Sequence, residues 1–254
     1  MTDNITKAVQ ALKSAKSVLF ITGAGISAES GLPTYRGVGG LYNDEETEDG
    51  IPVEMALAGE MLVARPEVTW KYLLQIERNC RGAKFNRAHA IIAEMESAFP
   101  RAWVMTQNVD GFHAAAGSKN LIEIHGNLHK LKCTDCAWRT IVKDFSGIKI
   151  PPTCPECGRP VRPDVVLFGE MLPEKEMDIY VDQVYRGFDI CFWIGTTAVF
   201  PYVQTPLIDA KFRGCTTVEI NPDDTVLSRE MDIKIALGAR EALEQIWIAF
   251  KKSY

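Results

Sequence analysis

Four of the seven cysteines form two Cys-x-x-Cys pairs, a spacing that predicts a zinc site. Cys133 and Cys136 make the first pair, and Cys154 and Cys157 make the second after an interval of residues 137–153. Four thiolates at about 2.3 Å complete the tetrahedral coordination of Zn²⁺ and leave no position for water. We therefore expect one structural zinc ion. Two disulfides or free thiols are the alternative.

A glycine-rich turn follows the first apolar run of the chain. The segment Gly23-Ala24-Gly25-Ile26-Ser27-Ala28 fits the pattern G-x-G-x-x-G/A, and Ala28 is expected to open a helix. Glycines there permit close backbone approach, and a helix N-terminus offers free N–H groups to a pyrophosphate. Glycines that serve only packing give the same pattern. The acidic residue of a dehydrogenase, expected roughly 20 residues further on, is missing because Asp44 and Glu45 follow a loop, which disfavours that class of enzyme.

Polar or glycine clusters also follow three other predicted strands, at Gln107-Asn108, Gly195-Thr196-Thr197 and Asn221. Ligands of open α/β sheets bind outside the carboxyl ends of the strands. These clusters are therefore expected to meet Gly23 in one crevice, although unrelated turns also favour such residues.

One histidine is placed where a general base could act. His125 ends the apolar run Leu121–Ile124 and precedes Gly126, and an imidazole at a strand end suits proton transfer near neutral pH. A packed or surface histidine is the alternative. Asp110 could orient a ribose or an amide, but an Asx turn explains it equally well.

The elements that must position these residues alternate between strands and helices. Short apolar runs predict strands at Val18–Ile21, Trp103–Met105, Asp189–Ile194 and Thr216–Ile220. Apolar positions at helical spacing predict helices around residues 5–12, 66–74, 88–95, 176–185 and 241–250. This order predicts an α/β fold with a doubly wound parallel sheet, Rossmann-like, over residues 1–254. Lys130–Pro163 lacks either period and is predicted to be an inserted zinc module, and Asn43–Pro52 a mobile loop.

Composition limits the partners and the compartment. A chain of 254 residues with 46% hydrophobic content allows one large core and a small satellite. A net charge of -5 disfavours direct binding to nucleic acid, but a locally acidic groove could attract lysine-rich peptides. We expect no membrane span and no secretion signal. The two Cys-x-x-Cys pairs favour a metal site in the reducing cytoplasm. The oligomeric state is left open.

The ordered series of motifs resembles the sirtuin (silent information regulator 2) family over nearly the whole chain. The series begins with residues 23–36, Gly23 to Arg36, and continues with Thr106–Asp110, His125-Gly126-Asn127 and the cysteine tetrad. It ends with Val165–Glu170, Gly195-Thr196-Thr197 and Ile220-Asn221. The family commonly has Ser where Thr197 stands and often Phe where Tyr35 stands.

This resemblance implies an NAD-dependent protein lysine deacylase that takes acyl-lysine proteins or peptides. NAD contacts are implied for Gly23, Ala24, Gly25, Ala28, Tyr35, Arg36, Gln107, Asn108, Asp110, Gly195, Thr196, Thr197, Asn221 and Ala239. His125 is implied as the base, with Asn108 and Asp110 holding the nicotinamide amide. The peptide is implied to lie along Val165, Val166, Phe168, Gly169 and Glu170. In the implied reaction the acyl oxygen attacks the ribose carbon as nicotinamide leaves, and the products are free lysine and O-acyl-ADP-ribose.

The acyl preference depends on two positions. Sirtuins that prefer succinyl- or malonyl-lysine place a Tyr and an Arg three residues apart on the helix after the mobile loop, and our alignment puts Leu73 and Ile76 there. Neutral acyl groups are therefore expected, although a slip of one residue would bring in Tyr72 and Gln75, and Arg78 lies near. Protein ADP-ribosylation or NAD hydrolysis on the same fold is the alternative activity, and a zinc-ribbon interaction module without catalysis is another.

Overall fold

A six-stranded parallel sheet forms the centre of the protein. The computed structural model describes residues 3–34 and 47–252, so Tyr35, Arg36 and residues 43–46 of the predicted loop lie outside the described residues. The strand order is β3-β2-β1-β7-β8-β9, and every neighbouring pair is parallel. The strands are β1 (Ser17–Thr22), β2 (Arg101–Thr106), β3 (Leu121–Glu123), β7 (Ile190–Ile194), β8 (Thr216–Ile220) and β9 (Ile233–Ile235).

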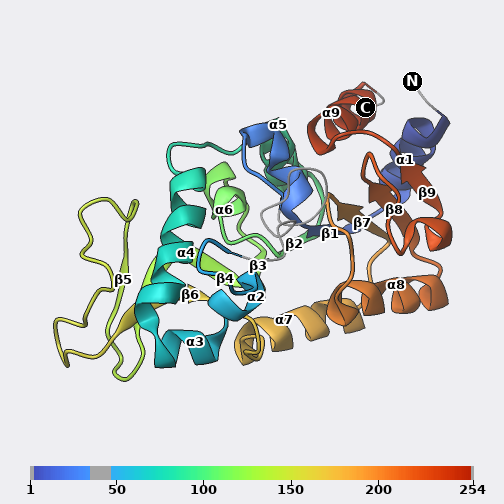
Figure 1. The fold of residues 1–254 in the computed structure, drawn as a ribbon. Helices are drawn as coiled ribbons and strands as arrows, with labels where there is room; N and C mark the ends of the chain where they lie inside the picture. Colours follow the sequence, from blue (N-terminus) through green and yellow to red (C-terminus); the bar gives the residue numbers. More distant parts are fainter. Residues whose placement is uncertain (1–2, 35–46, 253–254) are drawn as a thin grey trace.

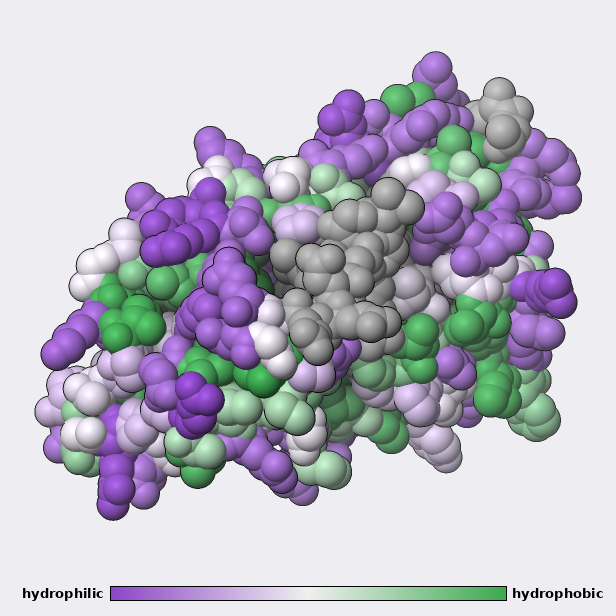
Figure 2. All heavy atoms as spheres, viewed as in Figure 1, coloured by the Kyte–Doolittle hydropathy of each residue, from purple (hydrophilic) through white to green (hydrophobic). Residues whose placement is uncertain are grey.

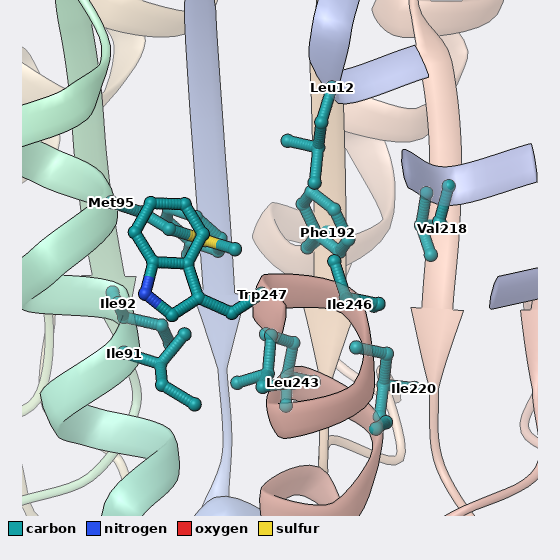
Figure 3. Close-up of a cluster of buried hydrophobic side chains, with 14 of the residues drawn as sticks. Leu12, Ile91, Ile92, Met95, Phe192, Val218, Ile220, Leu243, Ile246 and Trp247 are labelled. Atoms are coloured by element: carbon teal, nitrogen blue, oxygen red, sulfur yellow. The ribbon is translucent and has the colours of Figure 1, made fainter. Parts of the chain in front are cut away.

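Three helices cover one face of this sheet. They are α1 (Asp3–Ser14), α5 (Arg87–Ala98) and α9 (Ala239–Lys251), which gather at one side of the molecule in Figure 1. Figure 3 shows Leu243, Ile246 and Trp247 of α9 among side chains from α5 and the strands. Because these side chains are almost fully buried, they supply much of the apolar burial that stabilises the fold.

The opposite face is covered by α7 (Glu174–Tyr185) and α8 (Pro201–Arg213). Alternate residues of one strand serve the two faces: Phe192 packs with α9, whereas Cys191 and Trp193 pack with α7 and α8. Strands buried on both sides require the continuous apolar runs seen in the sequence. The predicted doubly wound α/β fold is confirmed.

A second, smaller body lies beside the sheet. It contains the antiparallel strands β5-β4-β6, which are β5 (Arg139–Ile141), β4 (Gly126–Cys133) and β6 (Val161–Val165). The helices α2 (Val53–Ala56), α3 (Gly59–Ala64) and α4 (Pro66–Cys80) pack on it. Trp70 of α4 is fully buried there and donates a hydrogen bond from Nε1 to the Val161 carbonyl (3.0 Å). The boundaries 130–163 for a zinc module stay a prediction, but its apolar core is completed by these helices.

Two local expectations differ from the structure. Ala28 does not open an α-helix: residues 24–30 form two single 3₁₀ turns, η1 (Ala24–Ile26) and η2 (Ala28–Ser30), and the second ends at Gly31 with φ +83°. A left-handed residue ends a helical turn, and Pro33 follows two residues later. The second difference is α8, which the sequence did not reveal because Pro206 interrupts its interior and its apolar periodicity is weak.

Two further short elements complete the described chain: α6 (Phe112–Ala116) after β2, and η3 (Ser228–Glu230) before β9. None of the helices in residues 3–34 and 47–252 has the length and apolar character required to cross a bilayer. The face in Figure 2 is mainly hydrophilic, with hydrophobic residues in small patches.

Candidate active site

A cavity of about 650 Å³ opens at the carboxyl edge of the large sheet and extends to the smaller body. Most of the predicted site residues line it together. These are Gly23, Ala24, Gly25, Ala28, Gln107, Asn108, His125, Val165, Val166, Phe168, Gly169, Glu170, Gly195, Thr196, Thr197, Asn221 and Ala239. The predicted convergence of strand ends is thus observed, while the roles of the individual residues stay predictions.

The glycine turns after β1 and β7 fit against each other so closely that side chains are excluded. Gly25 donates a backbone hydrogen bond to the Gly195 carbonyl (2.8 Å). A Cβ on Gly25 would lie 2.6 Å from the Gly195 Cα, and a Cβ on Gly195 would lie 2.5 Å from the Ile26 nitrogen. These strands are adjacent where the strand order reverses, which is the ligand crevice of doubly wound sheets. The glycines therefore serve packing and also keep the crevice floor open to a ligand.

Partly buried polar side chains connect the loops that form the floor of the crevice. Gln107 donates from Nε2 to Thr196 Oγ1 (2.8 Å), and Asn221 donates from Nδ2 to the Thr196 carbonyl (3.2 Å). These contacts join the loops after β2, β7 and β8. A floor preorganised in this way suits an extended dinucleotide, because little ordering is left for the moment of binding.

Asn108 and Asp110 lie beside a small adjoining cavity of about 20 Å³. Ser27 Oγ donates to Asp110 Oδ2 (2.7 Å) and accepts from Asn108 Nδ2 (3.2 Å). Burial raises the pKa of Asp110, while the Phe112 N–H and the Ser27 hydroxyl oppose that shift. Asp110 therefore lines this inner cavity and not the larger one, and the Ser27 hydroxyl joins it to Asn108.

His125 lies between the two bodies, in the connection from β3 to β4. The carbonyl of Gln107 can only accept, so Nδ1 of His125 carries the proton of that 2.8 Å hydrogen bond. Nε2 is then the basic nitrogen, and it lies 2.5 Å from the Tyr202 hydroxyl. Burial lowers the pKa of His125, and the bond to Gln107 opposes that shift. The imidazole is therefore neutral at physiological pH, as a general base requires.

The neighbouring Gly126 fixes the direction in which His125 points. Gly126 has φ +81°, and a Cβ there would lie 1.9 Å from the Asp164 carbonyl oxygen. Only glycine fits this contact between β4 and β6. The same pairing brings the next segment alongside, since the Val166 N–H donates to the His125 carbonyl (2.9 Å).

The segment Val165–Glu170 is held from behind by one buried arginine. Arg162 donates from Nη2 to the Val165 carbonyl (2.6 Å) and to Glu170 Oε2 (2.9 Å), and Glu170 in turn accepts from the Leu167 N–H (2.8 Å). Burial alone would raise the pKa of Glu170, but the hydrogen bonds from Arg162 and Leu167 hold it below its usual range. The segment is thus a rigid wall of the large cavity.

The cysteine tetrad forms one cluster whose geometry fits a tetrahedral metal ion. The four Sγ atoms lie within 4.8 Å of one another, with Cys133 and Cys157 at 3.4 Å and Cys136 and Cys154 at 3.6 Å. Ligands about 2.3 Å from zinc are separated by about 3.8 Å in a tetrahedron. The N–H groups of Cys136 and Asp135 donate to Cys133 Sγ and lower the pKa of that thiol. The cluster can hold one metal ion, consistent with structural zinc.

Known proteins match the chain along almost its full length. A model of the Sir2 family matches residues 23–201. The chain is 48% identical over 243 residues to the "NAD-dependent protein deacylase 2" of Pseudomonas syringae pv. tomato, with 94% of this chain and 98% of the relative covered. This chain belongs to the Sir2 family, the sirtuins.

Solved sirtuin structures superpose on this one throughout. A crystal structure of a Sir2 homologue with NAD has a TM-score of 0.87 at 36% identity and covers 98% of this chain and 94% of that one. A complex of Sir2 with deacetylated p53 peptide and 3′-O-acetyl ADP-ribose has a TM-score of 0.86 at 26% identity and covers 96% and 98%.

Several cavity residues of this sirtuin were not predicted from the sequence. Tyr202 and Phe200 belong to the start of α8, which was missed, although Pro201 directly after Phe200 is a signal for the first position of a helix. Ser27 lay inside the glycine motif but was not singled out, and no spacing rule connects it to Asp110. Leu73 and Ile76 both line the large cavity as the alignment predicted.

Proposed function

We propose that this sirtuin removes neutral acyl groups from lysine side chains of proteins and consumes NAD in doing so. One observation carries the proposal: a single cavity is lined by the strand-end clusters on one side and by Val165–Glu170 on the other, with neutral His125 between them. A reaction between two bound molecules needs both in one enclosed site beside a base. The similarity to proteins named NAD-dependent deacylases supports the same conclusion.

The crevice side of the cavity is proposed to hold NAD. The close-packed turns at Gly25 and Gly195 would face the pyrophosphate, and Asn221 and Ala239 would flank the far nucleoside. The inner cavity beside Asn108 and Asp110 would take the nicotinamide amide, for which a buried amide and a buried carboxyl offer partners. When bound, NAD supplies an electrophilic ribose carbon with nicotinamide as its leaving group.

The role proposed for His125 follows from its protonation. Nδ1–H is committed to the Gln107 carbonyl, so only Nε2 can accept a proton. A ribose hydroxyl next to Nε2 would give up its proton there, and the imidazolium formed would keep its bond to Gln107. His125 is partly buried and the floor residues Asn108 and Thr196 are buried, which limits the access of water to an oxocarbenium-like centre.

The peptide is proposed to lie against Val165–Glu170. This segment continues from the end of β6 and turns at Gly169, and its backbone is fixed to Leu57 and Gly59 through Phe168. An extended substrate can add to such a segment by strand pairing. The solved complex of a sirtuin with a deacetylated p53 peptide supports a peptide or protein as the substrate. Carboxylates of Glu29, Asp223 and Asp224 line the same cavity and would favour basic sequences around the acylated lysine.

The apolar lining favours neutral acyl groups. Leu73 and Ile76 of α4 line the cavity, whereas the Tyr72 hydroxyl is turned to Asp49 (2.6 Å) and Arg78 is exposed. Among the described lining residues there is no Lys or Arg to pair with an acyl carboxylate. An acidic acyl group would lose its hydration without a partner, which costs several kcal/mol.

The test is release of free lysine from peptides that carry acetyl-, butyryl-, myristoyl- or succinyl-lysine, with nicotinamide followed in parallel. We expect turnover of the neutral groups and at least about tenfold slower turnover of succinyl-lysine. The double substitution Leu73→Tyr/Ile76→Arg should raise succinyl turnover relative to acetyl because it supplies a guanidinium for the carboxylate. Nicotinamide release with every peptide intact would instead establish ADP-ribosyl transfer or NAD hydrolysis.

The cytoplasm is the proposed compartment. All seven cysteines are unpaired, including Cys191 and Cys215, whose Sγ atoms lie only 3.4 Å apart. Thiols so close together persist in a reducing environment. Growth of cells with a tagged copy of the protein, followed by fractionation, tests this proposal.

A further inference from the structure

The basic nitrogen of His125, Nε2, already has a hydrogen-bond partner in this structure, the phenol hydroxyl of Tyr202. The Tyr202 hydroxyl lies 2.5 Å from Nε2. Since Nδ1–H is committed to the Gln107 carbonyl, neutral Nε2 can only accept, and the phenol must be the donor. Burial raises the pKa of Tyr202, so its proton is present at every physiological pH.

Tyr202 is held in this position from three sides. Its carbonyl accepts from the Tyr180 hydroxyl (3.2 Å), and the next carbonyl, that of Val203, accepts from Trp193 Nε1 (2.9 Å). The ring of Tyr202 stacks on Phe200 with an interplanar angle of 13°. The backbone is thus fixed on the strand side, and the contact with His125 is built into the fold of β7, α7 and α8.

The loop that leads into α8 is also constrained. Ala198 adopts φ +55°, which is uncommon for a residue with a side chain, and its carbonyl accepts from Gln204 Nε2 (2.8 Å). Such conformations persist only where the surrounding contacts hold them. This loop carries Val199 and Phe200 to the cavity and places Tyr202, the second residue of α8, next to His125.

We propose that Tyr202 is a positioning residue for the deacylation reaction: its hydroxyl caps the basic nitrogen of His125, and the ribose hydroxyl of NAD must displace it. The cap fixes the imidazole ring and leaves the Nδ1–H tautomer as the one with both nitrogens satisfied. The inference rests on the proposed function, because it requires His125 to meet the ribose. It adds that binding of the ribose is opposed by one protein hydrogen bond.

The first measurement does not depend on activity. In ligand-free protein at pH 8, nitrogen NMR of His125 should show Nδ1 protonated and Nε2 accepting a hydrogen bond. In Tyr202→Phe, which keeps the stacked ring, the Nε2 resonance should move to that of an imidazole nitrogen without a donor. Tyr185→Phe is the matched control, since it removes an exposed phenol hydroxyl that touches neither His125 nor Tyr202. An unchanged Nε2 resonance in Tyr202→Phe overturns the proposal.

The second measurement is the dissociation constant of ADP-ribose by calorimetry. Tyr202→Phe should bind ADP-ribose about 3- to 10-fold more tightly, the equivalent of one neutral hydrogen bond that no longer has to be broken. In the His125→Ala background the same substitution should leave the dissociation constant unchanged. The proposal is overturned if Tyr202→Phe tightens ADP-ribose binding equally with and without His125→Ala. It is also overturned if Tyr202→Phe alone does not tighten binding.

Failure of the proposed function would look different. If no peptide is deacylated but the resonance and the ADP-ribose affinity respond as expected, the cap exists and the activity assigned to the site is wrong. If deacylation proceeds and the Nε2 resonance is insensitive to Tyr202→Phe, the activity stands and the cap does not.

Discussion

The two walls of the cavity are built on different physical foundations. The crevice wall belongs to a sheet whose strands are buried on both faces, and its loops are joined by direct contacts such as Gln107 with Thr196. The opposite wall, Val165–Glu170, belongs to a smaller body whose own core includes two of the clustered cysteines, Cys133 and Cys154. Burial of apolar area alone can stabilise the first wall. The second wall has a smaller core and is stabilised in addition by the four-cysteine cluster and by Arg162.

This difference suggests a division of labour. Of the groups proposed to perform chemistry, Asn108 and Asp110 follow β2 of the large sheet and His125 follows β3. Each is held by a hydrogen bond, to the Gly23 carbonyl, the Phe112 N–H and the Gln107 carbonyl respectively. Groups proposed to bind the peptide are attached to the smaller body. Substitutions in the first wall should therefore lower turnover, and disturbances of the second wall should lower substrate affinity first.

The largest effect is expected for His125→Ala. Removal of a general base lowers turnover by about 10²- to 10⁴-fold, and we expect deacylation at the lower end of detection. Steady-state rates on an acetyl-lysine peptide measure the loss, while the melting temperature and zinc content should match the wild type. Full turnover in the variant would show that another group takes the proton.

Loss of the metal should come next. Cys157→Ser removes one of four ligands, so the smaller body should lose much of its order and the protein its zinc. We expect a lower melting temperature and a peptide KM raised more than about tenfold, with zinc measured by atomic absorption. Cys215→Ala, which removes a buried thiol outside the tetrad, should retain its zinc. A chelated, metal-free sample that melts unchanged would contradict a structural role for the ion.

A moderate effect is expected from Arg162→Met, which disturbs the Val165–Glu170 wall but neither the crevice wall nor the cysteine cluster. The substitution leaves Glu170 and the Val165 carbonyl without their donor. We expect the peptide KM to rise about 3- to 10-fold with kcat within about twofold, measured by titration of the peptide at saturating NAD. Arg139→Met, which removes only an exposed ion pair with Asp164, is the control and should change neither. A loss confined to kcat would break the proposed division of labour.

The smallest effect is expected from pH. Burial lowers the pKa of His125 below its usual value of 6.5, so the neutral, active form is already the majority at pH 6.5. A base with a lowered pKa loses activity only as pH falls through that lowered value. kcat/KM should therefore change by less than about twofold between pH 8 and pH 6.5. A half-maximal rate above pH 6.5 would show that the imidazole is more exposed or paired with an acid.

Most of the fold was predictable because its strands are short, apolar and separated by helical patterns. Thr216–Ile220 was predicted at the bounds of β8, and the other runs lie within about two residues of their strands. Helix α8 was missed because Pro206 and polar residues obscure its period, and with it Tyr202 was missed. The cysteine cluster could be predicted from the spacing of its two Cys-x-x-Cys pairs alone. By contrast, the contact of Ser27 with Asp110 joins residues far apart in sequence, which no local pattern encodes.

The place of His125 in the chain has a mechanical consequence. β3 belongs to the six-stranded sheet and β4 to the three-stranded one, and His125 lies between them. This is one of several chain connections between the two bodies, and residues 81–86 and 166–173 are others. The proposed base is therefore anchored in both bodies: its Nδ1 is bonded to the loop after β2, and its carbonyl to the segment after β6. A shift of either body changes the geometry around the imidazole.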